Sequence, residues 1–169
     1  MATPAPSDYA PFYETYVRLV REDDLVKAFQ SSLEEITENL VLITADKADQ
    51  AYAEGKWTLK ELLQHMIDTE RVFSYRAMAF ARGEHQNLPG FDENAYANNA
   101  IVSARNLVEM KEELLSLRRA VYFMFKGFTE EDLSRSGTAN NNRVTVNAMG
   151  YIAIGHVRHH FNVMRERYL

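Results

Sequence analysis

Apolar residues recur at steps of three and four positions along four segments of the chain, which is the period of an amphipathic α-helix. The segments run from Asp23 to about Ile43, from Thr58 to Gly83, from Ser103 to Gly127, and from Thr145 almost to Leu169. No segment shows the apolar–polar alternation of a β-strand. The pattern therefore predicts an all-α protein, built as a four-helix bundle.

Residues typical of helix ends support these boundaries. Thr58 and Glu61 have the T-x-x-E spacing of a capping box, and Trp57 precedes them as a candidate hydrophobic staple. Gly83 is expected to end the second helix, because glycine readily adopts the conformation that closes a helix. Thr145 is expected to cap the fourth helix through its hydroxyl.

Three stretches lack helical periodicity. Residues 1–22 begin with the proline-rich TPAPSDYAP and continue with FYETYVRLV, which predicts a lead-in with one short aromatic helix. Residues 84–101, EHQNLPGFDENAYANNAI, form a long connection between helices two and three that can cross the length of the bundle. Residues 129–144 predict a short turn and a polar, Asn-rich loop. We therefore expect one bundle domain over residues 23–169.

Composition narrows the classes of partner. With 169 residues, of which 46% are hydrophobic and 25% charged, the chain has the profile of one globular domain. A formal net charge of −5 argues against general binding to nucleic acid or to a membrane, because both need a basic surface. No apolar run approaches the ~18 residues of a membrane span, and no signal peptide is recognisable. We expect a cytoplasmic protein that acts on a small molecule.

The chain has no cysteine, which excludes disulfides, thiolate zinc sites, iron–sulfur clusters and cysteine nucleophiles. The candidate chemistry lies instead in the histidines. His156 and His160 are four positions apart, so they share one edge of the fourth helix, and that edge is otherwise apolar. His159 lies about 100° from His160 and is the weaker candidate. His65 occupies the inward-facing edge of the second helix.

Three histidines from two facing helices would make a metal site that leaves positions free for substrate. Neutral imidazoles suit zinc, nickel, copper and iron alike, so these residues alone do not select the metal. An alternative stays open, because buried histidines often only hydrogen-bond to a carbonyl or carboxylate.

Two acidic residues near His65 have more than one interpretation. Asp68 can orient a histidine or act as a general base, although an ordinary charge on the polar edge of the helix is favoured. Glu70 lies about 140° round the helix from His65. We expect it in an ion pair with an arginine of a neighbouring element, and not on a metal.

The run WTLKELLQHMIDTERVFSYR at residues 57–76 is followed by LPGFDENAY and by a terminal helix with G-H-x-x-H-H. In this order the motifs resemble the DinB/YfiT-like superfamily, in its DinB_2 branch, over roughly residues 24–169. The resemblance implies a four-helix bundle with a divalent metal, commonly nickel or zinc. The implied ligands match His65, His156 and His160.

That superfamily includes bacillithiol S-transferases and mycothiol-dependent isomerases, beside metal-dependent hydrolases. A bound metal lowers the pKa of a thiol or a water, so thiol chemistry needs no protein cysteine when a low-molecular-weight thiol is the co-substrate. We expect such a thiol to be transferred to an electrophile. Hydrolysis by metal-activated water is a close second, and a non-enzymatic metal- or ligand-binding dimer is the third alternative. Relatives often dimerise, so a homodimer is expected.

Two alternative roles are equally expected for residues of the long connection. Phe91, Asp92, Glu93 and Tyr96 either cover the metal cleft or plug the end of the bundle. His85, beside the end of the second helix, is expected to be exposed. The aromatic run VYFMF in the third helix is expected in the core or in a dimer interface.

Overall fold

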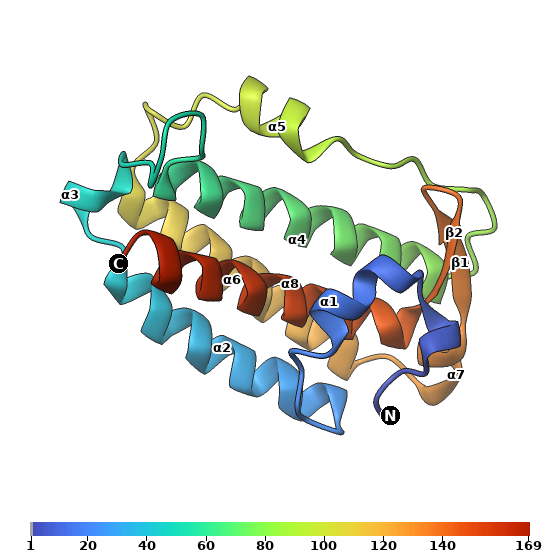
Figure 1. Ribbon diagram of the computed structural model, residues 1–169. Helices are drawn as coiled ribbons and strands as arrows, with labels where there is room; N and C mark the ends of the chain where they lie inside the picture. Colours follow the sequence, from blue (N-terminus) through green and yellow to red (C-terminus); the bar gives the residue numbers. More distant parts are fainter. Residues whose placement is uncertain (1) are drawn as a thin grey trace.

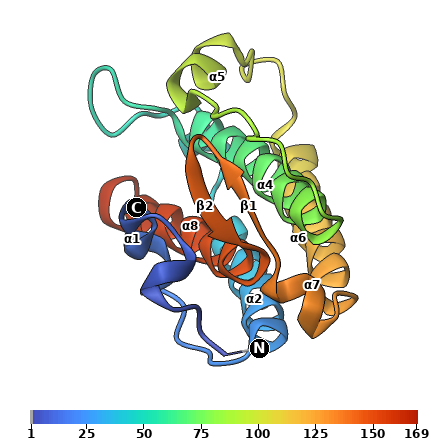
Figure 2. The ribbon, with the colours of Figure 1, turned by 90° about the vertical axis from the view of Figure 1, so that its right-hand side faces the viewer.

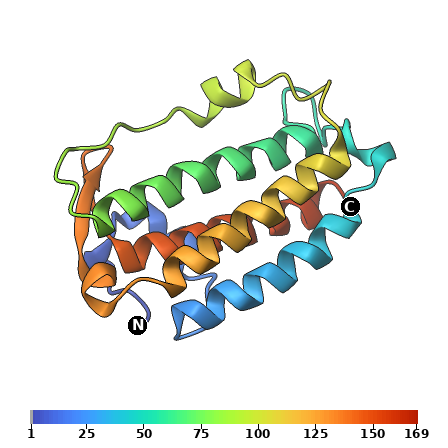
Figure 3. The same ribbon diagram turned by 180° about the vertical axis from the view of Figure 1, so that it is seen from behind.

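Four long helices run side by side in the computed structural model, which describes residues 2–169 (Figure 1). They are α2 (Leu25–Leu42), α4 (Leu59–Ala81), α6 (Leu107–Lys126) and α8 (Val146–Arg167). Both α2 and α4 pack against α6 and α8, so α2 and α4 occupy opposite corners of the bundle (Figures 1 and 3). The predicted four-helix bundle is confirmed. Within the described residues, no helix is both long and apolar enough to cross a membrane.

Short elements connect and cover these helices. They are the 3-10 helices η1 (Pro6–Asp8) and η2 (Pro11–Tyr13), the helices α1 (Glu14–Val17), α3 (Ala45–Ala48), α5 (Glu93–Asn99) and α7 (Glu130–Ser134), and the strands β1 (Ser136–Ala139) and β2 (Asn142–Thr145).

The order of the long helices around the bundle differs from their order along the chain. In Figure 1, α4 and α6 run from left to right, whereas α2 and α8 run from right to left. Because α4 and α6 are neighbours with the same direction, the chain between them must return along the whole bundle. Residues 82–106 make this return over the outer side of α4, which confirms the predicted long connection (Figure 1). The connection also contains α5, whose first amides are capped by Asp92.

The predicted caps of α4 and α8 are present. Thr58 Oγ1 accepts a hydrogen bond from the amide of Glu61, whose carboxylate accepts one from the amide of Thr58, so the capping box is confirmed. Gly83 has a φ of +81°, the left-handed conformation that closes α4. Thr145 caps α8 by accepting from the amide of Ala148.

The expected start of the third helix at Ser103 is wrong. The first turn of α6 begins at Leu107, because the side chain of Asn106 accepts hydrogen bonds from the amides of Val108 and Glu109. Asparagine is among the best residues at this capping position.

The expectation of a loop without strands before α8 is also wrong. Strands β1 and β2 form an antiparallel hairpin at one end of the bundle (Figure 2). Its tip holds Asn140 and Asn141, with φ values of 49° and 61°. Asparagine tolerates these left-handed angles, which a two-residue hairpin turn requires. Each strand has four residues, too few to show an alternating pattern.

The lead-in lies across α8, where α1 makes its contacts (Figure 1). The lead-in can approach α8 closely because position 155 is glycine. A Cβ at Gly155 would lie 2.1 Å from the carbonyl oxygen of Tyr16. Any side chain at this position would push the lead-in away from α8.

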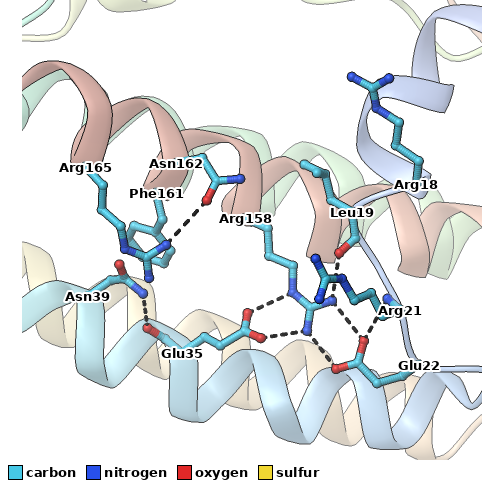
Figure 4. A pocket seen from close by; sticks show the side chains of 10 residues that line it. All are labelled: Arg18, Leu19, Arg21, Glu22, Glu35, Asn39, Arg158, Phe161, Asn162 and Arg165. Atoms are coloured by element: carbon cyan, nitrogen blue, oxygen red, sulfur yellow. Dashed lines mark hydrogen bonds and ion pairs between the residues drawn. The ribbon is translucent and has the colours of Figure 1, made fainter.

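A single arginine joins the lead-in, α2 and α8 on the outer side (Figure 4). Arg158 of α8 donates to both carboxylate oxygens of Glu22 and of Glu35 at 2.8–2.9 Å, and to the carbonyl of Leu19 at 3.1 Å. This hydrogen bonding lowers the pKa of Glu22 to about 2. The folded chain therefore favours the charged form of Glu22.

The core has two apolar parts separated by a polar layer, which consists of Ser32, Glu70, Arg118 and His156. Along each long helix these residues lie between the two apolar clusters, and each is at most 4% exposed. Arg118 Nη2 of α6 lies 2.9 Å from Glu70 Oε2 of α4 and donates to the carbonyl of Ala153 in α8 at 3.0 Å. The predicted ion pair of Glu70 is thus confirmed.

Arg118→Met should destabilise the protein by about 3–5 kcal/mol, because it leaves the buried charge of Glu70 without a partner. The double variant Glu70→Leu/Arg118→Met should cost less than Arg118→Met alone, since it removes both charges. Urea denaturation measures both free energies of unfolding. Glu131→Gln, which breaks the exposed pair with Arg135, is the control and should cost far less. A double variant less stable than Arg118→Met would contradict this account.

Glu22→Gln should reduce the sensitivity of the fold to acid. Folding lowers the pKa of Glu22 from 4.5 to about 2. The carboxylate of Glu22 therefore stabilises the fold above pH 4.5, and this stabilisation is lost as the pH falls toward 2. The wild type should therefore lose stability more steeply than Glu22→Gln between about pH 5 and pH 2.5. Urea midpoints across this range provide the measurement. Glu38→Gln, an exposed change on α2, should keep the wild-type slope, and equal slopes for all three proteins would refute the prediction.

Candidate metal centre

The structure brings together the three histidines that the sequence singled out. His65 comes from α4, and His156 and His160 come from α8, which packs directly against it. The Nε2 atom of His65 lies 3.0 Å from that of His156 and 3.1 Å from that of His160. The Nε2 atoms of His156 and His160 are 3.0 Å apart. All three imidazoles thus point one nitrogen at a common centre.

Hydrogen bonding alone does not account for this triangle. A neutral imidazole nitrogen carries either one hydrogen or one lone pair. Three such atoms in mutual contact therefore leave at least one pair of like groups facing each other, whichever tautomers are present. A cation at the centre would satisfy all three lone pairs at once.

The spacing of the nitrogens fits one divalent ion. Ligands about 2.0–2.1 Å from an ion are about 2.9 Å apart at right angles to each other, and about 3.3 Å apart at the tetrahedral angle. The observed 3.0–3.1 Å lies near the first value. Three nitrogens at this spacing would therefore fit a single divalent ion.

Burial keeps these imidazoles in the neutral form that a metal requires. Desolvation lowers the pKa of His65 to about 4, with His159 contributing. Desolvation, reinforced by the neighbouring imidazoles, lowers the pKa values of His156 and His160 well below 6.5. At neutral pH the cluster thus offers lone pairs without first releasing protons.

The histidines line a cleft of about 400 Å³ whose other walls are largely aromatic. Trp57 lies with its ring 4.9 Å from that of His65, and the ring of Phe73 is 5.7 Å from that of His156. The remaining lining residues are Phe12, Tyr13, Tyr16, Thr69, Arg76, Gly90, Phe91, Glu93, Asn140 and His159. The outer hollow in Figure 4 contains none of the three histidines.

The long connection borders this cleft. Phe91 and Glu93 line it, whereas Asp92 caps α5 and Tyr96 is half exposed beside the ring of Phe91. Of the two roles considered for this segment, the contacts of Phe91 and Glu93 favour covering the cleft.

Asp68 and His159 stand outside the histidine triangle. Asp68 accepts from Gln64 at 2.9 Å and lies 3.7 Å from Arg71. Within residues 2–169, no hydrogen bond joins Asp68 to a histidine. The half-buried His159 lines the cleft with its ring 5.5 Å from that of Tyr16. His85 is exposed, as expected.

The sequence did not assign Tyr13, Tyr16, Thr69 or Arg76 to the cleft. For the last two a signal was present, because positions four and eleven after His65 share its face of α4. The lead-in residues offered none, since their place depends on how the lead-in packs across α8.

The aromatic run in α6 is mainly a core feature. Val121, Tyr122 and Phe125 are buried, and Phe123 is 60% exposed.

Comparison with known proteins agrees with this architecture. The family model of the DinB superfamily matches residues 26–164. The chain belongs to the DinB superfamily. A similar solved structure is YfiT from Bacillus subtilis, described as a probable metal-dependent hydrolase with an unusual four-helix bundle topology. It has a TM-score of 0.71 and 15% sequence identity, over 84% of this chain and 82% of YfiT. At that identity the likeness concerns the fold. No curated protein matches the sequence significantly.

The DinB superfamily match begins after the lead-in. Phe12, Tyr13 and Tyr16 therefore lie outside the matched residues, although they form one wall of the cleft. This DinB-superfamily chain thus combines a histidine cluster within the matched region with a wall from outside it.

Removal of His160 should greatly weaken metal binding, whereas removal of its neighbour His159 should not. Purified without a histidine tag and loaded with zinc or nickel, the wild type and His159→Ala should hold about one ion per chain. His160→Ala should hold far less, because two imidazoles bind an ion more weakly than three. Elemental analysis measures the content, and metal-dependent increases in Tm provide a second readout. Metal retained in His160→Ala, or lost in His159→Ala, would sink this assignment.

Proposed function

We propose that this protein is a metal-dependent enzyme that transfers a low-molecular-weight thiol to a small electrophilic substrate. In this proposal His65, His156 and His160 hold one divalent ion, with nickel or zinc expected. The observation that carries it is the convergence of three Nε2 atoms within 3.0–3.1 Å in the wall of a cleft. A divalent ion supplies one property there, which is to lower the pKa of a thiol or water that it binds.

The surroundings of the histidines support transfer of a thiol over hydrolysis. Trp57 and Phe73 flank the histidines with apolar rings, which limits the access of water. Among the described residues, Glu93 is the carboxylate that lines the cleft, and it is exposed. A thiol is acidic enough to ionise on a metal without a strong base beside it, whereas hydrolysis usually depends on one. The aromatic walls also suit an apolar electrophile.

Hydrolysis is the second candidate, and one observation favours it. Asp68 and Glu93 both line a small hollow that reaches His65. A carboxylate there can orient a water molecule and accept its proton. The solved structure of YfiT, described as a probable metal-dependent hydrolase, adds support by analogy of fold.

A non-enzymatic metal- or ligand-binding dimer is the third alternative. The homodimer stays a prediction for size-exclusion chromatography to test.

Metal-loaded protein should accelerate the reaction of monochlorobimane with at least one thiol from a panel that includes bacillithiol, mycothiol, glutathione and cysteine. His65→Ala should abolish this acceleration, because only the two histidines of α8 would remain and two imidazoles bind an ion more weakly than three. Fluorescence of the bimane product measures the rate. His85→Ala changes an exposed histidine outside the cleft and should retain the wild-type rate.

A second assay separates thiol transfer from hydrolysis. Cleavage of p-nitrophenyl esters or anilides that needs metal and His65 but no thiol would support hydrolysis and contradict thiol transfer. Absence of both activities, with one ion bound per chain, would favour the non-enzymatic alternative.

A further inference from the structure

Arg76 is a buried cation without a carboxylate partner in the part of the chain that the structure describes. It belongs to α4, is 4% exposed and lines the cleft. Its Nη2 donates to the carbonyl of Pro89 at 2.8 Å, and its guanidinium carbon lies 6.0 Å from the centre of the Phe91 ring. Among residues 2–169 no ion pair includes it, whereas the buried Arg118 is paired with Glu70.

This arrangement is costly unless an anion joins it. An arginine remains charged even when buried, and a counter-charge stabilises such a buried charge. The guanidinium has five N–H donors. One is used by Pro89 and another interacts with the hydroxyl of Tyr13. The remaining N–H groups of Arg76 lie at the border of the cleft.

The placement of Arg76 relative to the histidines defines an elongated binding surface. Arg76 follows His65 by eleven positions, so it lies on the same face of α4, about 16 Å further along the axis. Between them Thr69, 1% exposed, lines the same cleft, and its Oγ1 has no hydrogen-bond partner among the described residues. One face of α4 therefore presents an imidazole, a hydroxyl and a guanidinium in a row.

Aromatic rings cover the surface between these polar groups. The ring of Tyr13 meets that of Phe73 edge to face at 6.3 Å, and Phe91 lies beside Arg76. A ligand that satisfies all of these groups has an apolar body and an anionic end. A carboxylate matches the planar fork of a single guanidinium with two parallel hydrogen bonds.

We propose that Arg76 binds the carboxylate of the substrate, which is an elongated organic acid with an apolar body whose opposite end reaches the histidines. This assignment rests on the proposed function for the reaction at that opposite end. Arg76 sets specificity, and Thr69 contacts a polar group between the two ends.

Matched probes test the anion site directly. Isothermal titration calorimetry should show metal-loaded protein binding trans-cinnamate about tenfold more tightly than cinnamamide, which has the same shape without the charge. Arg76→Gln keeps a donor for the Pro89 carbonyl but removes the charge, and should abolish this preference. Arg76→Lys should restore part of it. Arg82→Met, which removes an exposed arginine outside the cleft, should behave as the wild type. Circular dichroism melts verify that each variant folds.

A carboxylate can also bind a metal ion, so the titrations are repeated with His156→Ala/His160→Ala. The preference for cinnamate should persist in this variant and disappear when Arg76→Gln is added. A preference that survives Arg76→Gln but vanishes without the two histidines would place the anion on the metal and overturn the proposal. Equal affinity for the two probes, or no binding of cinnamate, would also overturn it. A wild type that holds no metal but still prefers cinnamate would refute only the proposed function.

Discussion

The buried ion pair between Glu70 and Arg118 is the interaction on which the centre of the bundle depends. Two charges removed from water must stay together, so α4 and α6 have one register relative to each other. The same guanidinium donates to the carbonyl of Ala153, which ties α8 to that level. Glu70 is five positions from His65, and Ala153 is three positions before His156. A polar contact beneath the cleft thereby fixes how the histidines of two helices face each other.

Much of this arrangement was predictable because helical periodicity is a local property. The spacing of His156 and His160 placed both on one edge, and the apolar residues along that edge indicated the interior. His65 followed from the same reasoning applied to a helix with clear ends, Thr58 and Gly83. The long connection could be predicted because it lacks periodicity over many residues. The resemblance of the motifs to the DinB superfamily then selected these three histidines as a set.

Features that depend on contacts between distant segments were not predictable. The hairpin strands are too short for a pattern, and the Asn-rich composition of the loop did not reveal the turn at Asn140–Asn141. The lead-in forms a wall of the cleft because Gly155 has no side chain to hold it away, which the sequence does not reveal. The role proposed for Arg76 rests on the lack of a carboxylate partner among residues 2–169, and only a three-dimensional structure can reveal that.

The order of the helices also determines when the site can exist during synthesis. Because α8 supplies two of the three histidines and packs against α1, α2 and α4, most contacts at the centre join residues far apart in sequence. Such non-local contacts form late in folding, because the chain must first lose the entropy of the long loops between them. A nascent chain that ends before α8 carries only His65 of the three clustered histidines. The ribosome must therefore release nearly the whole bundle before any metal can be captured by three imidazoles.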